Sequence, residues 1–205
     1  MHRDESAERF IHRLESFSDI VIGFSLAQLG LNFTVPSHGI DLITSPLWFF
    51  SYLFAFAIVC SMWFFHHRLF SQFFVPKTWP IVLNFLWLGL LVLLVYFTLL
   101  YVRLAVRGDT VVMRLYFGGY AIAYLILAVQ YLIGMNYLRG TLDEDELAQG
   151  KRGAAFMFLW MAPFLFCLIV TLTLQPGPLL GILIMLAFTL TGTASGVLGA
   201  YYRRA

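Results

Sequence analysis

Charged residues are scarce in this chain of 205 residues: Asp, Glu, Lys and Arg make up 12% of it, whereas soluble domains have about 25%. Hydrophobic residues make up 60% of the chain. A protein of 23.4 kDa cannot hide that much apolar surface inside a globule. The composition therefore excludes cytosolic enzymes and nucleic-acid binders, and it indicates an integral membrane protein.

Cysteines and the usual catalytic motifs are also scarce. The two cysteines, Cys60 and Cys167, both lie inside apolar runs, so we expect buried thiols and neither a disulfide framework nor a metal site. The chain has no G-x-S-x-G, H-E-x-x-H, Walker-type or C-x-x-C pattern. We therefore predict no enzymatic activity and no cofactor. The net charge of +2 indicates no electrostatic partner such as nucleic acid.

Long apolar runs, by contrast, are abundant. A membrane-spanning helix needs about 20 mostly apolar residues, and six such runs can be counted. They are Phe17 to Val35, Pro46 to Phe70, Trp79 to Tyr101, Val112 to Leu138, Gly153 to Leu174, and Leu179 to Tyr202. We predict an all-α, six-helix membrane bundle that forms one domain over residues 1–205. The first 16 residues mix both signs of charge, so we expect no signal peptide there.

The distribution of Lys and Arg predicts the orientation, because basic residues accumulate on the cytoplasmic side. With six spans, ten basic residues fall on one side and three, Arg103, Arg107 and Arg114, fall on the other. Both termini are therefore predicted to be cytoplasmic, in the plasma membrane. The acidic run at residues 143–146 falls between the fourth and fifth spans, where we expect a solvated loop.

The first span carries most of the intramembrane polar residues. Ser18, Ser25 and Asn32 recur every seven positions, with Gln28 beside them, so they form one stripe on a helix. Two interpretations are open. The stripe packs against neighbouring helices through hydrogen bonds, or it faces water in a pathway with Gln28 near the bilayer centre.

Polar residues from three spans are also predicted to share one layer near the cytoplasmic surface. The first span starts there, the second ends there and the third departs from it. The residues at this level are Arg13, Ser18, Asp19, Trp63, His66, His67, Arg68 and Asn84. We expect Asp19 to accept hydrogen bonds from an arginine or a histidine in an ion-paired cluster. His67 and Arg68 are expected at the interface, and the direction of His66 is open.

The segment from Arg13 to Asp19 fits the pattern R-x-x-x-F-S-D at the start of a first span. Together with Trp63 to Phe70 and Asn84, it resembles the transmembrane protein 175 family of potassium-permeable channels, whose prokaryotic members have six spans in a single repeat. The resemblance implies a homotetramer with four first helices around a central pore. It also implies that Arg13 and Asp19 belong to a structural network, together with Ser18, Trp63, His66 and Asn84, that ties the first span to the second and third.

The resemblance further implies which residues line the pore. In the family, apolar side chains five, nine and twelve residues after the motif aspartate constrict the pore, and a threonine eight residues after it assists selectivity. These positions are Phe24, Gln28, Leu31 and Ala27 here. Gln28 and Ala27 depart from the pattern, which predicts weak selectivity.

The functional hypothesis is accordingly a passive cation channel in the lipid bilayer that conducts potassium and, with weak selectivity, sodium. A secondary transporter and a non-conducting membrane scaffold are the alternatives.

Overall fold

The computed structural model describes residues 5–31, 46–104 and 108–201, and side chains in the ranges 46–51 and 197–201 are not considered. In these ranges the chain is built from helices, with no strand. They are α1 (Glu5–Leu31), α3 (Pro46–Gln72), α4 (Thr78–Leu104), α5 (Thr110–Tyr137), α6 (Glu144–Thr173) and α7 (Pro178–Tyr201). All six are long and apolar enough to cross a membrane. The prediction of an all-α, six-span protein is confirmed, although the end of the first predicted span, with Asn32, lies outside the described residues.

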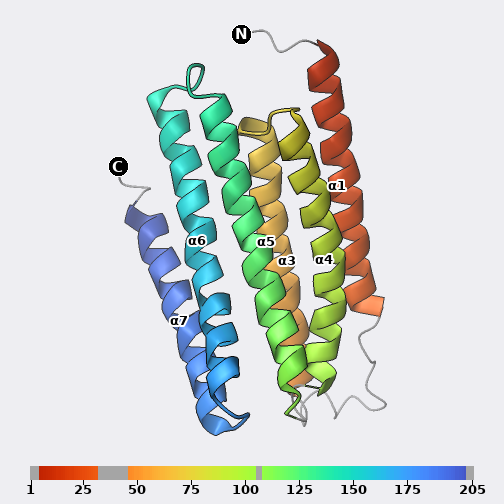
Figure 1. The fold of residues 1–205 in the computed structure, drawn as a ribbon, viewed down its shortest axis with the longest axis vertical. Helices are drawn as coiled ribbons and strands as arrows, with labels where there is room; N and C mark the ends of the chain where they lie inside the picture. The colour runs from red at the N-terminus through yellow and green to blue at the C-terminus, as the bar shows by residue number, and fades with distance from the viewer. Residues whose placement is uncertain (1–4, 32–45, 105–107, 202–205) are drawn as a thin grey trace.

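The helices stand side by side, with α5 in the interior and α1 and α7 at opposite edges (Figure 1). α5 packs against α4 and α6, and it also contacts α3. α1 packs on α4 and α3, while α7 packs on α6. Because α1 is at an edge, one of its faces remains uncovered.

Two helix starts are set by aspartates at the N-cap. Asp109 Oδ1 accepts hydrogen bonds from the backbone N–H groups of Val111 and Val112 at 3.0 and 3.2 Å, which satisfies donors at the start of α5. Asp143 forms a capping box with Glu146 at the start of α6. The expectation of a loop at residues 143–146 is therefore wrong. Carboxylates are favourable beside the positive end of the helix dipole, so the acidic run begins α6.

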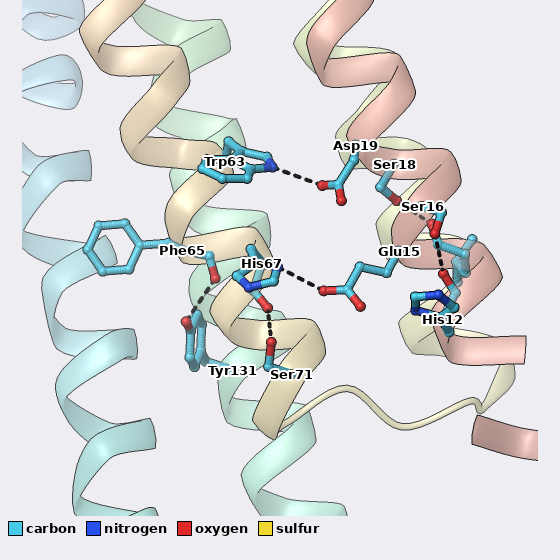
Figure 2. Close-up of polar contacts among 11 residues, drawn as sticks. His12, Glu15, Ser16, Ser18, Asp19, Trp63, Phe65, His67, Ser71 and Tyr131 are labelled. Atoms are coloured by element: carbon cyan, nitrogen blue, oxygen red, sulfur yellow. Dashed lines mark hydrogen bonds and ion pairs between the residues drawn. The ribbon is translucent and has the colours of Figure 1, made fainter. Parts of the chain in front are cut away.

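α5 comes very close to the end of α3 at Gly134. A Cβ at this position would clash with the carbonyl oxygen of Phe73, so a side chain there would require the backbone to shift. Tyr131, one turn away, donates a hydrogen bond from its hydroxyl to the Phe65 carbonyl at 2.9 Å (Figure 2). These contacts fix the level at which α5 meets α3.

Aromatic rings fill the interior between α5, α6 and α7. Phe164 of α6 is fully buried and lies centrally among them. Its ring centroid is 5.0 Å from Tyr120, 5.7 Å from Tyr124 and 4.9 Å from Phe188. Such ring contacts add specific attraction to the packing of the interior. Phe164 therefore connects three helices of the bundle.

Candidate functional site

α1 has one buried face and one exposed face. The buried side chains recur every three or four residues, as expected for a helix packed along one side. They are Ile11, Leu14, Ser18, Ile22, Ser25 and Leu29. Leu29 packs with Ala55 of α3 and Val95 of α4. The exposed face lies on the opposite side of the helix.

The two serines of the predicted polar stripe belong to the buried face. Ser18 Oγ donates to the Leu14 carbonyl and Ser25 Oγ donates to the Val21 carbonyl, both at 2.8 Å. Each hydroxyl thus satisfies its donor within α1, a common arrangement for serine in membrane helices. The water-facing interpretation is wrong for Ser18 and Ser25, because both are turned into the protein interior. Packing against α3 and α4 explains them.

The exposed face of α1 carries the residues that the family resemblance places at the pore. Phe24 is 64% exposed and Leu31 is 79% exposed. Ala27 is exposed between them, and Gln28 is partly buried. Ile20, which is also exposed, extends the face toward the start of the helix. At membrane depth such an apolar face contacts either lipid or another protein chain.

A hydrogen-bond chain crosses from α3 through α4 to α1. His66 Nε2 lies 2.8 Å from Asn84 Oδ1, and Asn84 Nδ2 donates to Ser18 Oγ at 3.2 Å. All three side chains are buried. His66 points inward and stacks on Trp87, with ring centroids 4.6 Å apart and an interplanar angle of 9°. The structure thus brings together three of the six predicted network residues.

A second pair of contacts joins α1 to α3 at the same level (Figure 2). Trp63 Nε1 donates to Asp19 Oδ1 at 2.8 Å, and His67 Nδ1 lies 2.9 Å from Glu15 Oε1. The partner of Asp19 is therefore a neutral indole, where an arginine or histidine was expected. Arg13 is exposed and makes no hydrogen bond or ion pair with the residues that the structure describes.

Sequence reasoning missed the pairing of Glu15 with His67, although its spacing carries a signal. Glu15 and Asp19 are four residues apart on α1, and Trp63 and His67 are four apart on α3. Residues four apart share a helix face. Because α1 and α3 run antiparallel, the two pairs meet as Asp19 with Trp63 and Glu15 with His67.

Replacing Asn84 by Leu should destabilise the protein by about 1–3 kcal/mol, because the His66 Nε2–H group is left buried without an acceptor. The free energy of unfolding in mild detergent, measured by denaturant titration, tests this. Asn136→Leu, at an exposed position of α5, should change it little. The double variant His66→Leu/Asn84→Leu should recover part of the loss, since both polar partners are then removed. Equal free energies of unfolding for the wild type and Asn84→Leu would contradict a stabilising role for the hydrogen bonds that link His66, Asn84 and Ser18.

These features define a class: a six-span, all-α membrane protein whose first helix is tied to two neighbours at one end and leaves an apolar face uncovered. The family model described as "Endosomal/lysosomal potassium channel TMEM175" matches residues 13–94, from the R-x-x-x-F-S-D motif into α4. The resemblance to the transmembrane protein 175 family is therefore confirmed.

One curated relative is a potassium channel of Chamaesiphon minutus, 39% identical over 93 residues. The match spans 42% of this chain and 44% of the relative, less than half of each. Two solved structures extend the likeness of the fold to nearly the whole chain.

The first is a variant of the potassium channel MtTMEM175 in complex with a nanobody fusion protein, with a TM-score of 0.69, 21% identity and 94% coverage of both chains. The second is a lysosomal potassium-selective channel TMEM175 homologue from Chamaesiphon minutus, with a TM-score of 0.62 and 21% identity. It covers 91% of this chain and 98% of that one. At these identities both comparisons show the fold.

Proposed function

We propose that this protein is a subunit of a homotetrameric, potassium-permeable cation channel whose pore is lined by the exposed face of α1. The observation that carries the proposal is this uncovered apolar face, on which Phe24, Ala27 and Leu31 lie. Supporting it are the confirmed family resemblance and the name of the curated relative, a potassium channel. Four copies of α1 around an axis would remove this face from lipid.

In the proposed pore, Phe24 and Leu31 form two apolar constrictions about 10 Å apart along α1, since seven residues separate them. Narrow apolar rings impede ions by excluding water. Ala27 has no hydroxyl that could replace part of an ion's hydration shell, and Gln28 adds an amide where the family has an apolar residue. We therefore propose weak discrimination between potassium and sodium.

The orientation proposed from the basic residues places both chain ends in the cytoplasm of a plasma membrane. Figure 1 supports an even number of crossings, because α1 starts and α7 ends toward the same end of the bundle. The contacts of Glu15 and Asp19 with α3 then lie near the cytoplasmic surface.

Flux measurements on purified protein in liposomes test the proposed function. Potassium and sodium influx should both exceed that of empty liposomes, with a small ratio between them. Uptake that saturates and depends on a coupled ion would favour a transporter. Absence of flux for both cations would contradict the channel proposal.

A non-conducting membrane scaffold is the second candidate, favoured by the buried position of Ser18 and Ser25. In that case the exposed face of α1 would meet lipid or a partner and would stay dry. Water access at position 28 distinguishes the two candidates.

A cysteine at position 28 should react with a charged, membrane-impermeant thiol reagent if α1 lines a wet pore, because the reactive thiolate forms only where water reaches it. Gln28→Cys is made in a background with Cys60→Ala and Cys167→Ala, and labelling is measured by mass spectrometry on intact liposomes. Leu29→Cys, whose parent side chain is 2% exposed, provides the dry control. Equal, slow labelling at both positions would favour the scaffold.

A further inference from the structure

Three buried side chains of the bundle interior carry polar atoms without a hydrogen-bond partner among the described residues. They are His66 at Nδ1, Trp87 at Nε1, and Gln130 at both Oε1 and Nε2. His66 and Trp87 are fully buried, and Gln130 is 3% exposed. Buried polar atoms are almost always hydrogen-bonded in folded proteins. Four such atoms in one interior therefore indicate hydrogen-bond partners that lie outside the polypeptide.

The packing of α4 and α5 places Trp87 and Gln130 on facing surfaces. Tyr120 and its neighbour Gly119 meet α4, through the Tyr120–Thr98 hydroxyl contact at 3.1 Å and the packing of Gly119 on Leu94. Eleven residues make three helical turns, about 16 Å. Trp87 lies eleven residues before Thr98, and Gln130 lies eleven residues after Gly119. Because α4 and α5 run antiparallel, the step back along α4 and the step forward along α5 lead toward the same end of the bundle. Trp87 and Gln130 therefore lie at about the same level.

His66 belongs to the same cluster. Its ring stacks on Trp87. The Tyr131 hydroxyl reaches the Phe65 carbonyl and Gly134 meets Phe73, so the part of α5 that carries Gln130 packs along the part of α3 that includes His66. The unpartnered atoms thus come from α3, α4 and α5 at one layer of the interior.

The existing hydrogen bonds determine what His66 requires. Asn84 donates to Ser18 through Nδ2, so its Oδ1 is the acceptor that faces His66 Nε2. The proton of His66 is therefore on Nε2, and Nδ1 presents a lone pair that needs a donor. The Trp87 N–H group needs an acceptor, and Gln130 needs both.

We propose that a buried water molecule binds at this α3–α4–α5 layer. It accepts a hydrogen bond from Trp87 Nε1 and donates hydrogen bonds to His66 Nδ1 and Gln130 Oε1, so it provides partners for three of the four atoms. About three hydrogen bonds are typical of a structural water in a protein interior. A direct bond between Trp87 and Gln130 is the competing arrangement, but it leaves His66 Nδ1 without a donor.

Water-edited solid-state NMR of the full-length protein in liposomes tests the proposal. The protein is labelled with ¹⁵N at the indole nitrogens, and Trp87→Phe assigns the Trp87 signal. We expect this signal to receive magnetisation from water at short mixing times although the side chain is fully buried. Trp79, which is 69% exposed, provides the reference for a wet indole.

Gln130→Met removes the polar amide at similar volume and should weaken the water transfer to Trp87 at least several-fold while Trp79 is unchanged. If this variant does not fold, the transfer of water magnetisation to Trp87 in the wild type still tests whether water is bound there. A Trp87 signal without water transfer in the wild type would overturn the proposal. If that dry signal also shifts in Gln130→Met, the direct Trp87–Gln130 bond is the correct arrangement.

Discussion

Replacing Phe24 by Ala is expected to raise cation flux through reconstituted protein about tenfold. Phe24 is the largest side chain among the residues proposed to line the pore, and its ring is 64% exposed in the single chain. Four such rings around an axis would form a narrow, dewetted constriction. A barrier lower by about 1.4 kcal/mol corresponds to a tenfold increase in rate. Potassium flux into liposomes, normalised to the amount of protein, measures the effect.

Phe158→Ala provides the matched control for this experiment. Phe158 is an exposed phenylalanine of α6. Since the helix α6 lies away from α1 in Figure 1, removing this ring should leave the flux unchanged. Oligomeric state is compared by cross-linking, so that a change in assembly is separated from a change in conduction. The same flux in wild type and Phe24→Ala, with assembly intact, would place the pore elsewhere.

Replacing Phe164 by Ala should cause the largest loss of stability. In water-soluble proteins the corresponding change costs about 3–5 kcal/mol, through both lost transfer from water and the cavity left behind. In a bilayer the separated helices remain in an apolar medium, so mainly the packing contribution is lost. We therefore expect a decrease of about 2–3 kcal/mol in the free energy of unfolding.

Phe166→Ala is the control for Phe164→Ala, because it lies two residues away on the same helix and is 43% exposed. Its free energy of unfolding should stay close to that of the wild type. Denaturant titration in detergent micelles, followed by far-UV circular dichroism, measures both variants. Similar losses for the two variants would contradict the central position of Phe164 between α5, α6 and α7.

The number and type of the helices could be predicted from the sequence because hydrocarbon tolerates few alternatives to long apolar helices. Which face of α1 is buried could not. Ser18 and Ser25 satisfy their hydroxyls on α1 itself, so their polarity does not mark contact with water. The buried face is determined by where α3 and α4 pack, which is tertiary information.

The depth of the polar layer could be predicted from the sequence, whereas the hydrogen-bond partners within it could be predicted only in part. Asn84 and His66 were placed at the level of Ser18 from the directions of the spans alone, and they are hydrogen-bonded there. Depth does not specify rotation about the helix axis, however. Arg13 lies six residues before Asp19, and at 100° per residue that step points it away from α3. Trp63 therefore takes the place expected for a charged partner of Asp19.

The position of the contacts along α1 also has a mechanical consequence. The polar contacts of α1 with α3 and α4 described above fall within residues 15–19, close to one end of a helix that continues to Leu31. Residues 19 to 31 form an arm about 18 Å long. A tilt of this arm by about one tenth of a radian about residues 15–19 displaces Leu31 by about 2 Å and Phe24 by less than half as much, and it must also slide the packing of Leu29 on Ala55 and Val95. Small rearrangements near Asp19 would thus be amplified toward the far side of the membrane.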